Sequence, residues 1–456
     1  MGKKTSVKRE IKRNKTELIL YEKNIYKALT VTALPLMLSN FIIALLDIAD
    51  TFFVGRINNA SAAQAGIGIA WPVINIMLAF NNGLSAAGIA VISRMFGEDN
   101  QESAAHYGGL LLVAACVMGI SINILLFAAA TALMRFMGAE GDVLNEAAIY
   151  LKISSFEMLP LFLFTAFCAM RQSMGDMVVP VIFSLVAAVV NIASIAVLVT
   201  GFGLGARGAA ISSLIGQLSI LPFYLRLLLK KGEGGLSIKK EMYMDKKGLA
   251  LLVRIAAPSV GSQVVGSFGF IILQAIILQA GQEASAAFSI GNKISNILLA
   301  VVMALGTSMS AFVGQNTGAK NVMRAKEAYR ASRNMSLVLT FLGLFLLFPV
   351  RRLLVCFMSK DAATVQASME YMLVVLLTLP GLALYQNYMG VFNGSGNTKL
   401  SLYMIFAWVW VFRIPLLLCL NRWTELGRAG VWYAMASSNI AVVFVGKVLF
   451  GRVKYE

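Results

Sequence analysis

The sequence predicts an all-α polytopic membrane protein, with twelve transmembrane helices in two six-helix bundles related by a pseudo-two-fold axis along the membrane normal. Three observations lead to this fold class. The chain is 58% hydrophobic and only 13% charged, with a mean hydropathy of +0.76, which lies outside the range of soluble domains. Nearly uncharged stretches recur along its whole length, each long enough as a helix to cross roughly 30 Å of hydrocarbon. The second half of the chain also resembles the first.

The apolar stretches follow one another from one end of the chain to the other. Helices are their expected form, because lipid offers no hydrogen-bond partner to an open backbone. The first stretch is too long for the apolar part of a signal peptide and lacks a small-residue cleavage site, so we expect it to be retained. In chain order, the expected spans are 29–54, 62–92, 107–133, 147–170, 177–200, 208–229, 255–280, 284–313, 334–357, 366–393, 400–420 and 430–450.

The distribution of basic residues indicates the orientation of these spans. Lys and Arg gather in the N-terminal tail, between the sixth and seventh spans, and after the eighth span, whereas most alternate loops carry one or two. By the positive-inside rule, both termini are cytoplasmic. The net charge of +17 follows from this bias, which also attracts anionic lipid head groups. Nucleic-acid binding is disfavoured, because the basic loops are short and lack interleaved aromatic residues.

An internal repeat divides the chain into two similar halves. Four pairs of residues coincide when the halves are shifted by about 221 positions: Asn75 and Asn296, Gly97 and Gly318, Asn100 and Asn321, and Gly175 and Gly396. The expected division is a basic tail 1–28, an N-lobe 29–229, a linker 230–254, a C-lobe 255–450 and a tail 451–456. Because each half has an even number of spans, the halves are parallel repeats, as in transporters that bind substrate between them near the membrane midplane.

Other function classes fit the sequence less well. A channel would need a carbonyl filter or a ring of charges, and the sequence contains neither. An enzyme would need a nucleophile with a base, or a metal, and the sole histidine, His106, stands in no HExxH, GxSxG or Cys/His motif. The four cysteines are scattered through apolar spans without metal spacing. We therefore expect a transporter and not an enzyme, with no cofactor and no structural metal.

Few charged residues lie inside the spans, and a charge within a membrane usually marks a functional site. Asp47 and Asp50 are three positions apart in the first span, so a helix places both on one face. A carboxylate in a low-dielectric pocket can take up a proton, or Na⁺, from one side and release it to the other. Alternatively, Asp50 only reaches the lipid head groups. For Glu157, in the fourth span, a place at the cleft and one near a membrane face stay equally open.

Two basic residues also fall within the spans. Arg413 is a counter-charge or a brace on backbone carbonyls freed by Pro415, and we favour the brace. Lys293 either extends toward the membrane surface or pairs across the bundle. Together with amide and aromatic residues, they form the expected substrate cavity, whose candidates are Asn75, Asn82, Asn292, Lys293, Asn296, Tyr385, Gln386, Asn387 and Arg413.

Several motifs carry a resemblance to a known family. "LPLMLSNFIIALLDIADTFFVGR" (34–56), "GLGARGAAISS" (203–213), "FNGSGNT" before the eleventh span and "VFRIP" (411–415) together resemble the multidrug and toxic compound extrusion (MATE) family, over essentially the whole chain. The resemblance implies twelve helices in two lobes that form a V. It also implies export of organic cations or other amphipathic compounds in exchange for H⁺ or Na⁺.

Within that family the chain resembles the DinF-like branch more than the NorM-like branch. For the DinF-like branch the resemblance implies an ion site in the N-lobe, at positions that match Asp50, Asn191 and Ser213. The family often has an aspartate four residues after that asparagine, where this chain has Ile195, and the C-lobe carboxylates of the NorM-like branch are absent. We therefore hypothesise H⁺ coupling through Asp50, with Asp47 replacing the missing carboxylate. Na⁺ bound by Asp50 and Asn191 is the alternative.

The expected function is a secondary active antiporter of the bacterial cytoplasmic membrane. It would export amphipathic, cationic organic compounds or drugs by alternating access. Its expected partners are small organic substrates and membrane lipids, with no nucleic acid, and we expect a monomer. The alternative is a flippase for lipid-linked oligosaccharide or lipid from the same superfamily, which is less favoured because such proteins expose more basic residues in the cleft than Lys293 and Arg413.

Overall fold

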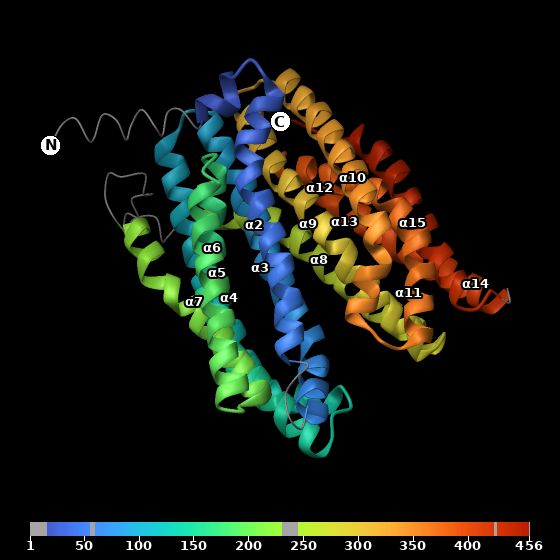
Figure 1. Ribbon diagram of the computed structural model, residues 1–456. Helices are drawn as coiled ribbons and strands as arrows, with labels where there is room; N and C mark the ends of the chain where they lie inside the picture. Colours follow the sequence, from blue (N-terminus) through green and yellow to red (C-terminus); the bar gives the residue numbers. More distant parts are fainter. Residues whose placement is uncertain (1–15, 55–59, 230–244, 424–425, 456) are drawn as a thin grey trace.

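The computed structural model describes residues 16–54, 60–229, 245–423 and 426–455, with side chains described for residues 16–45 and from residue 66 onward within these ranges. This part of the chain is helical and holds 12 candidate membrane spans, long and apolar enough to cross a bilayer. The helices form two lobes, and the all-α, twelve-span fold class is confirmed (Figure 1).

The N-lobe contains the first six spans. Its elements are α2 (Ile25–Val54), α3 (Ala60–Gly97), α4 (Gln101–Phe136), α5 (Gly141–Ser173), α6 (Val178–Ile195) with the π-helical extension η1 (Ala196–Gly201), and α7 (Gly205–Leu229).

The C-lobe contains the other six. Two of its spans are interrupted, one by a 3₁₀ turn and one by a π-helical segment. Its elements are α8 (Lys246–Gln279), α9 (Gln282–Gly318), α10 (Val322–Met358), α11 (Ala362–Val375) with η3 (Leu376–Thr378) and α12 (Leu379–Gly394), α13 (Thr398–Phe406) with η4 (Ala407–Arg413) and α14 (Ile414–Trp423), and α15 (Arg428–Phe450).

Several helices begin earlier than the hydropathy pattern predicts. Helix α10 begins at Val322 rather than at 334, and α8 begins at Lys246 rather than at 255. The side chains of Asn321 and Asp245 cap these two helices, accepting hydrogen bonds from backbone N–H groups of the first turn. Hydropathy detects only the part of a helix that lies in hydrocarbon, so the charged first turns were assigned to loops.

The backbone repeats between the two lobes at the offset found in the sequence. Asn100 and Asn321 are both N-caps, and their side chains accept from the N–H groups three residues later, at 2.9 and 3.1 Å. The residues just before them, Asp99 and Lys320, have φ values of 53° and 56° and are the only non-glycine residues with positive φ in the described ranges. Such left-handed conformations are uncommon outside glycine. Their occurrence at equivalent positions supports duplication.

Helix α2 lies between the two lobes and packs on both (Figure 1). Just before and along its first turns, Ile19, Ala28 and Leu29 are fully buried in the apolar core of the C-lobe. Further along α2, the Asn40 amide donates to the carbonyl of Ala300 on α9 at 3.1 Å. The first span is therefore shared between the lobes, although its place in the sequence assigns it to the N-lobe.

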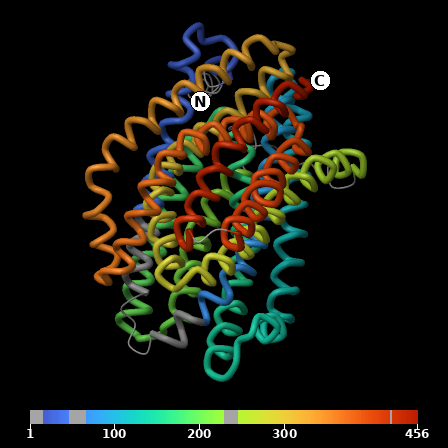
Figure 2. The backbone as a smooth tube through the Cα atoms, turned by 90° about the vertical axis from the view of Figure 1, so that its right-hand side faces the viewer, coloured from blue at the N-terminus to red at the C-terminus, as the bar shows by residue number. Residues whose placement is uncertain are grey.

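The lobes meet closely where α3 and α9 end. A Cβ on Gly97 would collide with the carbonyl oxygen of Gln315, and one on Gly318 would collide with the carbonyl of Arg94. Glycine at both positions lets the two backbones touch. The first and last described residues of the chain, 16 and 455, lie at this same end of the molecule, which we call the terminal end (Figure 2).

Gly97→Ala is expected to destabilise the fold by about 1–3 kcal/mol, because the added methyl group overlaps a rigid backbone carbonyl. The measurement is the unfolding temperature of the purified protein in detergent. Gly68→Ala is the matched control on the same helix, where nothing lies within 4 Å of the new Cβ. An equal loss of stability in both variants would contradict the close contact between α3 and α9.

Candidate functional site

In the N-lobe, two residues expected to bind the coupling ion lie together. The Asn191 amide on α6 donates to the Ser213 hydroxyl on α7 at 3.2 Å. The two helices approach closely because of Gly216, where a Cβ would lie 2.8 Å from the carbonyl oxygen of Ala187 and 3.2 Å from the Asn191 Cβ. No other hydrogen bond of the Asn191 side chain occurs within the described residues, so its amide oxygen can serve as an acceptor or a ligand.

The two aspartates of the first span belong to α2, which packs against α6 and η1. The side chains of Asp47 and Asp50 lie outside the described residues, so their distance to Asn191 stays a prediction. Ile195, which stands where an aspartate is common in the family, is only 3% exposed on α6. It offers no ligand, so any carboxylate at this site must come from another helix.

A second polar contact in the N-lobe joins α3 and α5. The buried Asn81 amide donates to the Thr165 hydroxyl at 2.8 Å, while its oxygen has no hydrogen-bond partner among the described atoms. The candidates on this helix were Asn75, which is half-buried, and Asn82, which is exposed. The three amides are indistinguishable by composition. Asn81, and not Asn75 or Asn82, contacts α5 because of the rotation of α3 about its own axis, which depends on packing.

Glu157 is placed on α5 two helical turns before Thr165, so both residues occupy one face of the helix. Its carboxylate forms no hydrogen bond or ion pair with another described residue. A half-buried carboxylate without a partner in a membrane helix is costly and commonly functional. Glu157 therefore joins the N-lobe candidates.

In the C-lobe, Arg413 at the end of η4 is 2% exposed and fully enclosed. Its guanidinium donates to the hydroxyl of Ser438 at 2.9 Å and to the amide oxygen of Asn439. Its carbon centre also lies 4.4 Å from the Trp408 ring centroid, a favourable cation–π distance. Arg413 thus braces η4 against α15 through side chains, whereas the sequence suggested backbone carbonyls.

The remaining cavity candidates divide between the C-lobe core and its more open surfaces. Asn387 is fully buried and binds the hydroxyl of Ser336 at 2.8 Å together with that of Ser332. The Tyr371 hydroxyl donates to Asn292 at 2.9 Å. The other candidates are Tyr385, which is buried against Trp408, Lys293 and Gln386, which are half-buried, and Asn296, which is exposed. The structure therefore brings few of these candidates into direct contact.

At the terminal end, side-chain contacts join the lobes. His106 Nε2 on α4 lies 2.8 Å from a carboxylate oxygen of Asp245, the N-cap of α8. The Gln315 amide on α9 donates to the carbonyl of Ser173, the last residue of α5, at 2.7 Å. The backbone N–H of Gly248, together with the His106 contact, holds the pKa of Asp245 below its usual value. These contacts stabilise the lobes in the closed arrangement at this end.

The described residues contain no group of three or more His, Cys, Asp or Glu side chains that could hold a metal ion. A cation held by Asn191 and Ser213 would therefore need a charged ligand from another helix, since dehydration of Na⁺ requires several oxygen ligands. Helix α2, which bears Asp47 and Asp50, and helix α5, which bears Glu157, both pack on the α6–α7 pair.

Comparison with known proteins gives a consistent result. The family model MatE matches residues 35–197 and 258–418, once in each lobe. A Bacillus subtilis protein named "Probable multidrug resistance protein YoeA" is 23% identical over 90% of both chains. A Thermotoga maritima protein named "Probable multidrug resistance protein NorM" is 23% identical over 91% of this chain and 90% of its own length.

Among solved structures, one described as the outward-facing conformation of a multidrug resistance MATE family transporter superposes with a TM-score of 0.91. The alignment covers 97% of this chain and 98% of that chain, at 20% sequence identity. This similarity establishes the two-lobed fold.

Arg413→Lys is expected to lower stability by about 1.5–3 kcal/mol, because an ammonium group cannot reach both Ser438 and Asn439 and leaves a buried acceptor unpaired. Arg422→Lys, at an exposed position on α14, is the matched control and should change stability by less than about 0.5 kcal/mol. Unfolding in detergent measures both. An unchanged unfolding temperature in Arg413→Lys would contradict the brace.

Asp245→Asn is expected to destabilise the protein at neutral pH, because the amide keeps the helix cap but loses the charge that faces His106. The folded state lowers the pKa of Asp245 from 3.8, so this charge contributes stability above pH 3.8 and loses it as pH falls through the lowered value. Wild type and variant should therefore converge in unfolding temperature at acidic pH. A difference that persists unchanged at pH 3 would contradict this role.

Proposed function

This chain belongs to the MatE family of transporters, and from that premise we propose that it is a secondary active antiporter that exports amphipathic, cationic organic compounds in exchange for H⁺. Alternating access of the site between the lobes would carry the substrate across the membrane. Homologues named as multidrug resistance proteins support a multidrug efflux transporter of this general type.

The observation that carries the proposal is the Asn191–Ser213 pair beside the helix that bears Asp50. An amide and a hydroxyl can hold a carboxyl group in either protonation state, because the amide has an acceptor oxygen and a donor NH₂ group and the hydroxyl can both donate and accept. At Ile195, where the family often has an aspartate, this chain supplies no carboxylate beside the pair. A single carboxyl group assisted by neutral partners suits a proton better than a dehydrated Na⁺. This arrangement also supports a DinF-like rather than a NorM-like ion site.

Helix α2 would transmit protonation to the rest of the molecule. Its outer part carries Asp47 and Asp50, and its inner part packs into the C-lobe core through Ala28 and Leu29. A change in charge near α6 would thus alter the contact between α2 and α9, including the Asn40–Ala300 hydrogen bond. Proton binding would then be coupled to transport if the protonated and deprotonated forms favoured different packings of α2 against α9.

We infer the orientation of the protein in the membrane from the basic residues at the terminal end. Lys and Arg concentrate near the ends of α2, α8 and α10 that lie there, which supports a cytoplasmic location for both termini. The contacts of His106 with Asp245 and of Gln315 with Ser173 close this end. Closure on the cytoplasmic side corresponds to an outward-facing state, with the site accessible from the opposite side.

Burial of Arg413 argues against the flippase alternative. A lipid diphosphate needs cationic side chains exposed in the cleft, whereas this guanidinium is 2% exposed and already bound to Ser438 and Asn439.

Asp50→Asn is expected to reduce export of a fluorescent organic cation at least tenfold in proteoliposomes with an imposed pH gradient, since the coupling carboxyl group is lost. Asn191→Ala should weaken transport less, because Asn191 only positions the proton site. Asp99→Asn is the matched control, since Asp99 is exposed and its left-handed backbone conformation tolerates Asn.

The same vesicles, given a Na⁺ gradient at equal pH, separate the two coupling ions. Transport that occurs only under the pH gradient supports H⁺ exchange. Transport that occurs only under the Na⁺ gradient would contradict H⁺ exchange and support Na⁺ exchange. Wild-type rates for Asp50→Asn under both gradients would reject an ion site on α2.

A further inference from the structure

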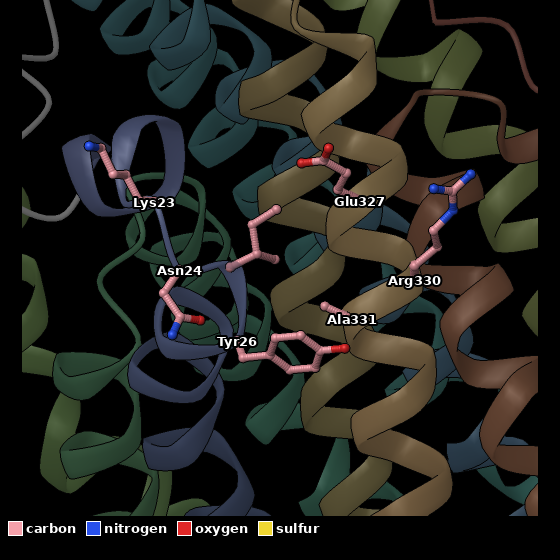
Figure 3. Close-up of a pocket in the computed structure, with 7 residues that line it drawn as sticks. Lys23, Asn24, Tyr26, Glu327, Arg330 and Ala331 are labelled. Atoms are coloured by element: carbon pink, nitrogen blue, oxygen red, sulfur yellow. The ribbon is translucent and has the colours of Figure 1, made fainter.

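A cavity of about 540 Å³ lies at the terminal end, between the start of α2 and the first turns of α10 (Figure 3). It lies at the opposite end of α2 from Asp47 and Asp50 and is separate from the proposed ion site. The residues that line it are Lys23, Asn24, Ile25, Tyr26, Glu327, Arg330 and Ala331.

The walls of this cavity are held by hydrogen bonds between the chain before α2 and α10. The Arg324 guanidinium donates to the carbonyl oxygens of Ile19 and Glu22 at 2.9 and 2.8 Å. The Asn334 amide donates to the Tyr26 hydroxyl at 3.3 Å, so the phenol keeps its own proton for another acceptor. The cavity is therefore built before a ligand arrives.

The charges around the cavity are of both signs. Lys23 stands on one side and Arg330 on the other, with the Glu327 carboxylate between them (Figure 3). Neither Lys23 nor Arg330 forms an ion pair with another described residue. Nearby, Glu22 is already paired with Lys27 at 3.1 Å, and this hydrogen bond lowers the pKa of Glu22. Within the described residues, α10 thus presents one cation, Arg330, and one anion, Glu327, to the cavity, while the Lys23 side chain points away from α10 (Figure 3).

These charges are ordered along the membrane normal. Glu327 lies nearer the terminal end of α10 than Arg330, by three residues or roughly 4.5 Å of helix. Beyond Arg330, toward the membrane centre, α10 exposes Val338 and Phe345, at 65% and 75%, as expected of side chains that face lipid. Along α10, a ligand in this cavity would therefore meet the Glu327 carboxylate first, then Arg330, and then hydrocarbon.

We propose that this cavity binds the head group of phosphatidylethanolamine from the leaflet at the terminal end. The lipid phosphate would lie against Arg330, and the lipid ammonium would lie on Glu327. Two carbons separate phosphate from ammonium in this lipid, which matches the one-turn spacing of Arg330 and Glu327. The acyl chains would follow the exposed apolar side chains of α10.

The mixed charges distinguish this lipid from related ligands. Phosphatidylglycerol has the phosphate but no cation for Glu327. Phosphatidylcholine has a cation without N–H donors, so it cannot form the charge-assisted hydrogen bond. Soluble phosphate compounds lack chains for the apolar surface below Arg330. The site goes beyond the proposed transport function and depends on neither the coupling ion nor the exported compound.

The test is native mass spectrometry of the full-length protein in detergent with phosphatidylethanolamine, phosphatidylglycerol and phosphatidylcholine of identical chains. The wild type is expected to retain phosphatidylethanolamine several-fold more than the other two. Glu327→Gln should abolish the preference over phosphatidylglycerol, and the double variant Lys23→Gln/Arg330→Gln should lose most of the bound lipid. Glu140→Gln and Arg422→Gln, at exposed positions away from the cavity, are the matched controls and should retain wild-type binding.

Three results would overturn the proposal. The first is equal retention of the three lipids by the wild type. The second is an unchanged preference in Glu327→Gln together with unchanged binding in the double variant. The third is displacement of the lipid by soluble glycerophosphoethanolamine at the same concentration, which would show that the acyl chains add nothing and that the source is a free phosphate compound.

Discussion

Hydrocarbon offers no hydrogen-bond partner, so a polar side chain inside this bundle depends on other parts of the protein for its hydrogen bonds. In the C-lobe this constraint is met completely around Arg413, whose guanidinium reaches Ser438 and Asn439. Asn387 is likewise enclosed by Ser332 and Ser336. Such networks hold helices together and leave little for a ligand. In the N-lobe, Asn191 binds Ser213 yet keeps its amide oxygen, and Ile195 stands where the family often has an aspartate. This free amide oxygen, close to α2, is the basis of our proposal that the N-lobe holds an exchangeable ion.

Glycine contacts and a shared first helix connect that site to the whole molecule. Gly97 and Gly318 let α3 and α9 touch at the terminal end, so the lobes can press together on one side of the membrane. Helix α2 passes between them, with Leu29 buried in the C-lobe core. Because α2 packs on both lobes, the ion binding that we propose near α6 would change how the lobes meet. A transporter needs such a mechanical link between its lobes, and the continuous helix α2 provides it.

The sequence predicted the features that repeat or that depend on composition alone. The twelve spans, their order and the two-fold division are visible in hydropathy and in pairs such as Asn100 and Asn321, both of which cap helices. The family motifs also pointed to Asn191 and Ser213, which the structure brings into contact, while their part in ion binding stays a prediction. Helix starts such as Lys246 were missed because charged first turns resemble loops. The choice of Asn81 over Asn75 and Asn82 depends on helix rotation, which the pattern of apolar residues leaves undefined.

The central claim is that one carboxyl group on α2 exchanges a proton for the exported cation, with Asn191 and Ser213 as neutral partners. Its most direct test is proton release from purified, weakly buffered protein when an organic cation is added. The account predicts release of about one proton per molecule from the wild type and almost none from Asp50→Asn, with binding of the cation weakened only moderately in the variant. Binding without proton release in the wild type, or equal release from both proteins, would contradict it.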